Sequence, residues 1–164
     1  VTVGSFSKSL GLAGWRLGFL AGHAKLVTEI LKIQDCSVIC AGRAGQEGLR
    51  AALSEAEKHV LRARTVLHDR RDRLMTALRA AHLEAFVEPR GSLFLFLRLP
   101  GVRDDEEFCR RLLEERHVVV VPGRVFGPGG EGSVRLSYGS TTPDGLDVVA
   151  GRIAAALEGS SIKS

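Results

Sequence analysis

The chain of 164 residues is 45% hydrophobic and 26% charged, which indicates a globular protein with a packed core and excludes a disordered chain. The formal net charge of +4 does not predict nucleic-acid binding, because the arginines alternate with acidic residues on one long helical segment. No apolar run of about 18 residues is present and no secretory segment opens the chain, so we expect a cytoplasmic protein without a membrane span.

The first 56 residues carry two strand patterns and two helix patterns. The second helix pattern is weakened by Gly42, Gly45 and Gly48, because glycine is unfavourable inside a helix. The strands are predicted at 1–3 and 14–21, the helices at 23–33 and 41–56, and a short link at 35–40.

Residues 57–81 have the most regular helical period of the chain. Apolar side chains form one narrow stripe, and arginine and aspartate fill many of the other positions. The stripe consists of Val60, Leu67, Leu74, Leu78 and Ala81. A long helix of this kind often bridges two bodies, so we expect a domain boundary within it.

From residue 82 the pattern alternates between strands and helices, which predicts a small α/β domain. The second of these strands is apolar enough to be buried on both faces. The strands are expected at 84–87, 93–99, 117–121 and 134–138, and residues 159–164 are expected to form a flexible tail.

Capping residues mark the starts of two helices in this part of the chain. Asp104 fits the N-cap position of one helix, and Thr142 followed by Pro143 fits the start of the last helix. The inward stripes are expected to be Phe108, Leu112 and Leu113 in the first helix, and Leu146, Val149, Ala150, Ile153, Ala154 and Leu157 in the last.

The three cysteines, Cys36, Cys40 and Cys109, have no zinc-like spacing. Cys36 and Cys40 would lie one turn apart on a helix, which leaves a redox pair as an alternative. The favoured interpretation is that all three are small buried side chains in a reducing compartment. The five histidines share no metal-ligand spacing either, so no metal site is predicted.

Segment 5–18 combines one lysine, Lys8, with small hydroxylated neighbours and one arginine, Arg16, eight positions later. Small residues allow a planar cofactor to approach, serine hydroxyls can bind phosphate oxygens, and an arginine can neutralise a phosphate through two parallel hydrogen bonds. The segment therefore predicts a lysine that reacts with the aldehyde of a phosphorylated cofactor. The alternative is a chance strand and turn that carries a surface lysine.

Position for position, this segment resembles the lysine-attachment motif of the class I/II aminotransferases, which are fold type I enzymes that use pyridoxal 5'-phosphate (PLP). The resemblance implies that Lys8 forms a Schiff base with PLP and acts as the acid and base of transamination. It also implies that Ser5 and Arg16 bind the phosphate of PLP, with Ser7 as a weaker candidate. A surface salt bridge is the alternative role for Arg16.

Arg135 lies inside an otherwise apolar strand, where burying an arginine is costly unless it meets an anion. It stands in an Arg-Leu-Ser run, and the preceding residues 121–127 match a Pro-Gly-x-x-Phe-Gly segment of the same family. The resemblance implies that Arg135 binds the α-carboxylate of the substrate. A buried structural ion pair would give the same local sequence.

The resemblance covers almost the whole chain but only the later part of the family's length. It implies an α/β, aspartate aminotransferase-like fold: a remnant of the large PLP-binding domain at 1–56, an inter-domain helix at 57–81, a small C-terminal α/β domain at 82–158, and the tail. The ring-nitrogen aspartate and other cofactor contacts of the family have no counterpart here. We therefore expect a fragment without efficient turnover by itself.

For the complete enzyme, the resemblance implies transfer of an amino group between an α-amino acid and a 2-oxo acid. Such enzymes of amino acid metabolism usually act as homodimers on small-molecule substrates. One alternative is another fold type I reaction, catalysed by a lyase, a decarboxylase or an acyl-transferring relative. Another is the aminotransferase-like effector domain of a transcriptional regulator.

Overall fold

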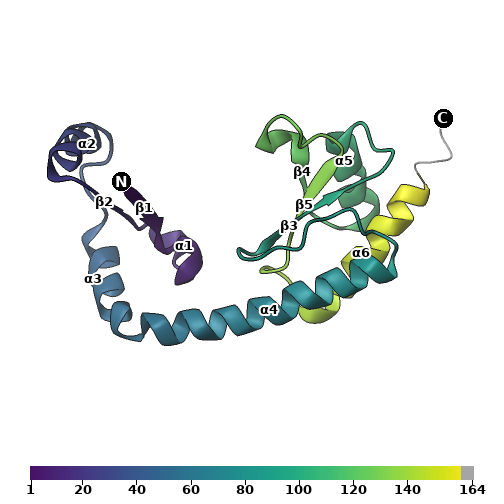
Figure 1. Ribbon diagram of the computed structural model, residues 1–164, viewed down its shortest axis with the longest axis horizontal. Helices are drawn as coiled ribbons and strands as arrows, with labels where there is room; N and C mark the ends of the chain where they lie inside the picture. Colours follow the sequence, from purple (N-terminus) through teal and green to yellow (C-terminus); the bar gives the residue numbers. More distant parts are fainter. Residues whose placement is uncertain (160–164) are drawn as a thin grey trace. The chain divides into compact units, whose positions relative to one another are not determined.

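The structure of the chain, a computed structural model, describes residues 1–159 (Figure 1). The chain divides into two compact units, and the dividing point between Arg64 and Thr65 lies inside the long helix α4 (Ala56–Ala80). The domain bounds drawn from the sequence stay a prediction. Among the residues that the structure describes, no helix has both the length and the apolarity needed to cross a bilayer.

The first unit consists of a two-stranded antiparallel hairpin and short helices. Ser5 pairs with Gly18 at one end of the hairpin and Thr2 with Ala21 at the other. Its elements are β1 (Thr2–Ser5), α1 (Phe6–Ser9), a 3-10 turn (Ala13–Trp15), β2 (Gly18–Ala21), α2 (Ala24–Ser37), α3 (Arg43–Ala52) and a second 3-10 turn (Leu53–Glu55).

Two predicted bounds in this unit are wrong. The second strand begins at Gly18 instead of residue 14, because the 3-10 turn and the left-handed backbone of Arg16 (φ 56°) interrupt extended structure. Helix α2 continues through most of the predicted link, since its last turn contains no glycine or proline and Val38 N–H still donates to Gln34 O at 2.9 Å.

The glycines of α3 have a packing role. Gly45 is buried, and a Cβ at Gly48 would lie 3.2 Å from a ring carbon of Trp15. The contact with Trp15 is tight at Gly48, where a side chain would press on the ring, whereas Gly45 leaves ordinary contact distances to Leu17 and Trp15. Gly48, which weakens the helix pattern in the sequence, thus gives room to the Trp15 ring.

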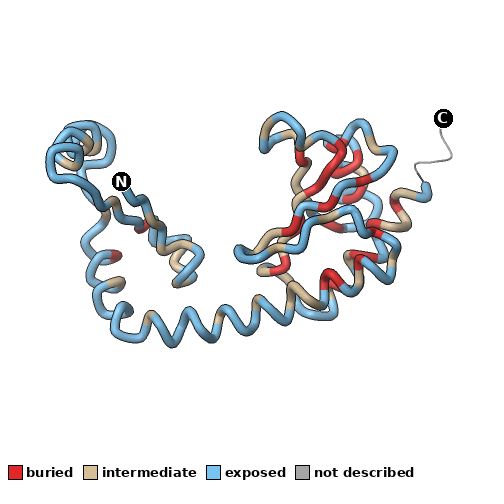
Figure 2. The backbone as a smooth tube through the Cα atoms, viewed as in Figure 1, coloured by how far each residue is buried: buried red, intermediate tan, exposed pale blue. Residues whose placement is uncertain are grey.

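The stripe predicted on the long helix is buried only toward the C-terminal end of α4. Leu74, Met75 and Leu78 are buried, whereas Val60 is 39% exposed. Figure 2 shows this change along the helix, from exposed residues in its first part to buried residues in the part that belongs to the second unit. Periodicity identified the helix, but the second unit determines which part of its stripe is covered.

The second unit contains a three-stranded antiparallel sheet of order β3-β5-β4, together with helices α5 (Asp105–Arg116) and α6 (Pro143–Glu158). The strands are β3 (Phe94–Arg98), β5 (Ser133–Ser137) and the two-residue β4 (Val121–Pro122), followed by a 3-10 turn (Gly123–Phe126). Gly159 caps α6, and the rest of the predicted tail, 160–164, lies outside the described residues.

Two strands predicted for this unit are wrong. Segment 84–87 makes a single bridge from Phe86 to Leu97, because Phe86 N–H donates within its own segment to Glu84 O. Residues 117–120 precede β4 without joining the sheet. Val118 N–H there donates to Leu112 O as part of the end of α5.

The sheet has one buried face and one outer face, although the sequence predicted that strand 93–99 is buried on both. Cross-strand pairs Leu95–Leu136 and Leu97–Val134 are buried in the core with side chains from α4, α5 and α6. Phe96 pairs with Arg135 on the outer face, where Phe96 is exposed. The alternation of a strand therefore applies even where nearly every side chain is apolar.

The predicted helix caps are confirmed. Asp104 accepts a hydrogen bond from Glu107 N at 3.2 Å, and Thr142 accepts one from Gly145 N at 3.3 Å ahead of Pro143. The inward stripe of α5 is partly wrong, because Leu113 is exposed. The buried positions of α5 are Asp105, Phe108, Cys109 and Leu112, which follow a helical spacing of three and four.

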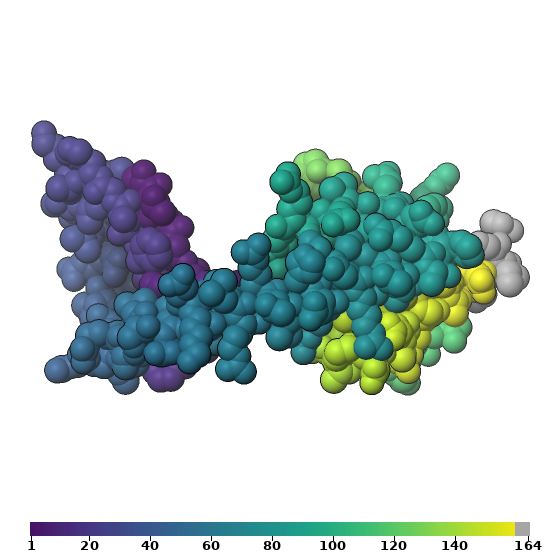
Figure 3. Space-filling model, turned by 60° about the horizontal axis from the view of Figure 1, so that its bottom comes forward, coloured from purple at the N-terminus to yellow at the C-terminus, as the bar shows by residue number. Residues whose placement is uncertain are grey.

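Arginine side chains of α4 contact α6 and the loop that precedes α6. Arg73 on α4 pairs with Asp144 at 2.8 Å and with Asp147 at 2.6 Å, both on α6. Figure 3 shows the two helices side by side on this face of the second unit. Arg70 also donates to Gly139 O at 3.0 Å.

The expectation that all three cysteines are buried is wrong for two of them. Only Cys109 is buried, and it lies in the core of the second unit. Cys36 is exposed on α2, which has no buried residue among those that the structure describes, and Cys40 is exposed in the link that follows this helix.

Candidate active site

Lys8 lies on a single helical turn that directly follows strand β1. The strand ends at Ser5, whose backbone is extended and whose Oγ accepts a hydrogen bond from Ser7 N at 3.2 Å. Ser9 Oγ donates to Ser5 O at 3.4 Å. The hydroxylated residues of the motif thus cap and close this turn, and the Lys8 side chain is exposed.

Backbone pairing brings the arginine of the motif to the same end of the hairpin. Ser5 pairs with Gly18, and Phe6 N–H donates to Leu17 O at 3.2 Å. Arg16 directly precedes Leu17, so its backbone lies at the same end of the hairpin as Ser5. Lys8 follows two residues after Phe6.

The Arg16 guanidinium is exposed and carries no carboxylate partner within residues 1–159; its Nη1 donates to Ala13 O at 3.0 Å. Its backbone lies in the left-handed region, which costs a non-glycine residue about 1–3 kcal/mol. The surface salt bridge, which was the alternative role, is not formed by the described residues.

Arg135 lies in the second unit, on the outer face of the sheet, and is half buried. Its guanidinium carbon lies 4.2 Å from the ring centroid of Phe94 and 4.7 Å from that of Phe126. Phe96 meets the Phe126 ring edge-on at 5.2 Å. No carboxylate pairs with Arg135 in the described part of the chain, so the buried ion pair that was its alternative explanation is absent there.

Sequence reasoning missed a buried acid that supports this region. Asp105, fully buried at the start of α5, accepts hydrogen bonds from Arg124 N at 2.8 Å and from Arg124 Nε, and Asp104 accepts one from Arg124 Nη2 at 3.0 Å. The four acids at 104–107 and the arginine after Pro122-Gly123 were a possible signal. Only the tertiary structure shows which acid turns inward.

This ion pair shifts the pKa values of both partners. Burial raises the pKa of the Asp105 carboxyl, but the hydrogen bonds from the Arg124 backbone and guanidinium outweigh it, so the pKa lies below its ordinary value. The hydrogen bond that Arg124 donates to Asp105 raises the pKa of Arg124. Asp105 is therefore a charged carboxylate at neutral pH.

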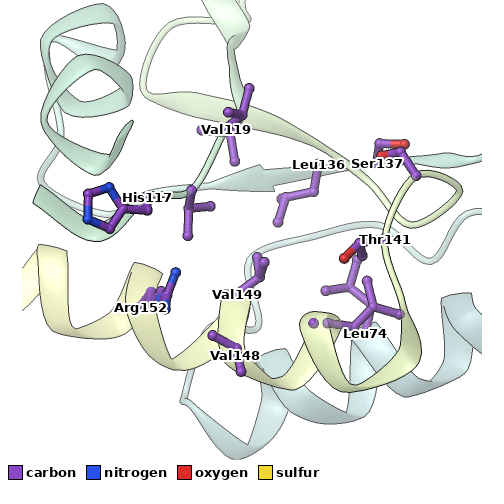
Figure 4. Close-up of a pocket in the computed structure, with 14 residues that line it drawn as sticks. Leu74, His117, Val119, Leu136, Ser137, Thr141, Val148, Val149 and Arg152 are labelled. Carbon is purple, nitrogen blue, oxygen red and sulfur yellow. The ribbon is translucent and has the colours of Figure 1, made fainter. Parts of the chain in front are cut away.

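The described residues of the second unit line at least two hollows. An open one of about 830 Å³ lies on the outer sheet face beside Phe94, Phe96 and Arg98. The other, of about 290 Å³, has His117 and Arg152 at one end and Ser137 with Thr141 at the other, with apolar walls between (Figure 4). None of the site residues predicted from the sequence lines either hollow.

Ser5, Ser7, Lys8 and Arg16 thus lie on backbone segments at one end of the hairpin in the first unit, and Arg135 lies in the second unit. No cluster of three or more histidine, cysteine, aspartate or glutamate side chains that could hold a metal ion occurs among residues 1–159.

Residues 1–153 match the family described as aminotransferase class I and II. The aspartate aminotransferase of Thermotoga maritima is 34% identical over 141 residues, which is 86% of this chain and 35% of that protein.

Solved structures of aminotransferases are similar to this chain as well. A crystal structure of an aromatic aminotransferase from Pyrococcus horikoshii has a TM-score of 0.87 and 31% identity, and the match covers 98% of this chain and 43% of that chain. An α-aminoadipate aminotransferase from Thermus thermophilus, complexed with N-(5'-phosphopyridoxyl)-L-leucine, has a TM-score of 0.84 and 28% identity over 99% of this chain and 42% of that chain. The predicted fold class is confirmed, and the chain spans less than half the length of each relative.

Proposed function

The chain belongs to the aminotransferase class I and II family, and from this membership we propose that it carries the lysine and the carboxylate-binding arginine of a PLP-dependent aminotransferase. The complete enzyme would move an amino group between an α-amino acid and a 2-oxo acid. The observation that carries the proposal is the backbone pairing that puts the segments of Ser5, Lys8 and Arg16 at one end of the β1–β2 hairpin.

The chemistry of this group of residues fits PLP. Two hydroxyls, on Ser5 and Ser7, and the guanidinium of Arg16 are donors suited to a phosphate dianion. Lys8 presents an amine on the next helical turn, exposed for covalent attachment of the cofactor. When bound, PLP supplies an electron sink that stabilises negative charge at the substrate's α-carbon.

The residues of the chain then have separate tasks in the proposed reaction. Arg16 and Ser5 hold the phosphate and fix the position of the cofactor. The Nζ of Lys8 acts first as the point of attachment and then as a base that takes the proton from the substrate α-carbon. Arg135 binds the α-carboxylate through its in-plane N–H groups, which orients the substrate for this proton transfer.

The finer assignments also belong to the proposal. The relatives compared above are named for aspartate, aromatic and α-aminoadipate transamination, which favours an aminotransferase over a lyase, a decarboxylase or a regulator domain. We propose α-amino acids and 2-oxo acids as small-molecule substrates, a homodimer as the assembly, and the cytoplasm as the location.

Covalent labelling tests the lysine assignment in the full-length protein. After loading with PLP, reduction with borohydride followed by peptide mass spectrometry should find the label on Lys8. The Lys8→Ala variant should lose the label and the activity, while Lys25→Ala, which removes an exposed lysine of α2, should keep both. A label that remains on other lysines in Lys8→Ala protein, at the wild-type level, contradicts the assignment.

Substrate kinetics test the arginine assignment separately. Truncating a charge that binds a carboxylate costs about 2–5 kcal/mol when the pair is buried. Arg135 is only half buried, so we expect Arg135→Ala to raise the KM for both substrates by an amount near the lower limit, about thirtyfold. An unchanged KM would leave Arg135 without a role in substrate binding.

A further inference from the structure

We propose that Phe94 and Phe126 are positioning residues for Arg135, which hold its guanidinium ready for a carboxylate before substrate binds. The inference rests on the proposed function, in which Arg135 binds the α-carboxylate. It concerns how the side chain is held, which neither the motif nor the family membership states.

The two rings occupy space around the guanidinium that water would otherwise fill. The guanidinium carbon lies 4.2 Å and 4.7 Å from the two centroids, within the range of about 6 Å in which a cation is attracted to an aromatic ring. The apolar rings lower the local dielectric, which strengthens attraction to an incoming anion. The in-plane N–H groups of Arg135 stay available as donors, since ring contacts do not satisfy them.

Holding the side chain in advance also reduces the entropic cost of binding. An arginine side chain has about 2 kcal/mol of rotamer freedom to lose when it is immobilised. Contacts with Phe94 and Phe126 restrict it in the free protein, so less freedom is lost when the carboxylate arrives. This is the physical content of the positioning role.

Core packing does not explain the placement of these rings. The core cluster of the second unit includes leucines, Phe108 and Tyr138, but none of Phe94, Phe96 and Phe126. Phe126 is 48% exposed. Apolar rings left partly in water, in contact with a cation on the face that carries Arg135, are better explained by that contact than by fold stability.

The buried acid of α5 explains how the exposed Phe126 ring stays in place. Phe126 ends the 3-10 turn that starts at Gly123, and a Cβ at Gly123 would overlap Gly130 O, so the turn lies tightly against the following loop. Asp105 accepts from both the backbone and the side chain of Arg124 in the middle of this turn. Asp105 therefore positions Phe126 through the backbone of the turn, and Phe126 positions Arg135.

Substitutions at Phe126 in the full-length enzyme test the proposal. Phe126→Leu should raise the KM for both amino acid and 2-oxo acid by about threefold to thirtyfold, the range of a cation–π contact between exposed and desolvated settings. The kcat and the affinity for PLP should stay unchanged. Phe126→Tyr should keep the KM of the wild type, because tyrosine keeps the aromatic face at this position.

A double-mutant cycle distinguishes positioning from a general structural effect. In an Arg135→Ala background, Phe126→Leu should cause no further rise in KM, since the ring acts only through the guanidinium. The matched control is Phe86→Leu, which removes a ring 5.6 Å from Arg79 in the same unit and should leave the KM unchanged.

Three outcomes would overturn the inference: an unchanged KM in Phe126→Leu, failure of Phe126→Tyr to keep the KM of the wild type, or an equal effect of Phe126→Leu with and without Arg135. An unchanged KM in the single variant Arg135→Ala would instead contradict the proposed function, in which Arg135 binds the carboxylate. Thermal midpoints of all variants, measured alongside, exclude loss of folded protein as the cause of a higher KM.

Discussion

The change Asp105→Asn is expected to lower the free energy of unfolding by about 2–3 kcal/mol. Asparagine has the same shape, so no cavity forms. Its carbonyl can still accept from Arg124 N, but its amide group would turn donors toward the guanidinium. Breaking a buried ion pair costs about 3–5 kcal/mol. We take a smaller value because the Arg124 side chain is 35% exposed and water can solvate it again.

Urea unfolding of the 164-residue chain measures this change. The chain has one tyrosine, Tyr138, buried in the same unit as Asp105, and one tryptophan, Trp15, in the first unit. All variants therefore carry Trp15→Phe, so that the near-ultraviolet signal of Tyr138 reports on the second unit. The matched control is Glu107→Gln on the same helix. It removes an exposed pair with Arg110, which water and salt screen, and should therefore cost clearly less stability than Asp105→Asn. If Asp105→Asn costs no more than Glu107→Gln, the inward carboxylate does not stabilise the turn.

The pH dependence gives a second measure of the same interaction. The pKa of Asp105 is lower in the folded protein than in the unfolded chain, where it is about 3.9. The ionised Asp105 therefore contributes its full share of folding stability at pH values above the unfolded pKa. This stability is lost as the pH falls through the folded pKa. The stability difference between wild type and Asp105→Asn should be constant near neutral pH and shrink below about pH 4.

Two substitutions and one labelling experiment test the packing of the chain further. Gly123→Ala should destabilise the second unit by about 1–3 kcal/mol in urea unfolding, because the added Cβ overlaps the neighbouring loop backbone; a neutral effect would contradict the tight turn. Tyr138→Phe should cost about 1 kcal/mol, since its hydroxyl donates to a backbone carbonyl at 3.0 Å, and a gain in stability would refute that. Burial raises the pKa of the Cys109 thiol to about 11, so iodoacetamide at pH 8 should label Cys36 and Cys40 first; equal rates at all three would refute the buried assignment.

Local sequence determined the parts of this protein that depend on neighbouring residues. The caps at Asp104 and Thr142 form as expected, because a capping hydrogen bond spans only three residues. The long helix α4 follows from its period. The motif around Lys8 folds into a strand and a turn whose hydroxyls bond the nearby backbone.

Pairings between distant residues were decided by the tertiary structure alone. An apolar run such as 93–99 looks the same whether one face is buried or both, and only the helices packed on one side of the sheet leave Phe96 exposed. Likewise, four consecutive acids at 104–107 do not reveal that Asp105 turns inward to Arg124, nineteen positions away. The sequence by itself determined the chemistry available to this protein, namely a lysine, hydroxyls and two arginines. Packing decided which aromatic rings contact Arg135 and which acid bonds to Arg124, because those contacts join segments that no local pattern connects.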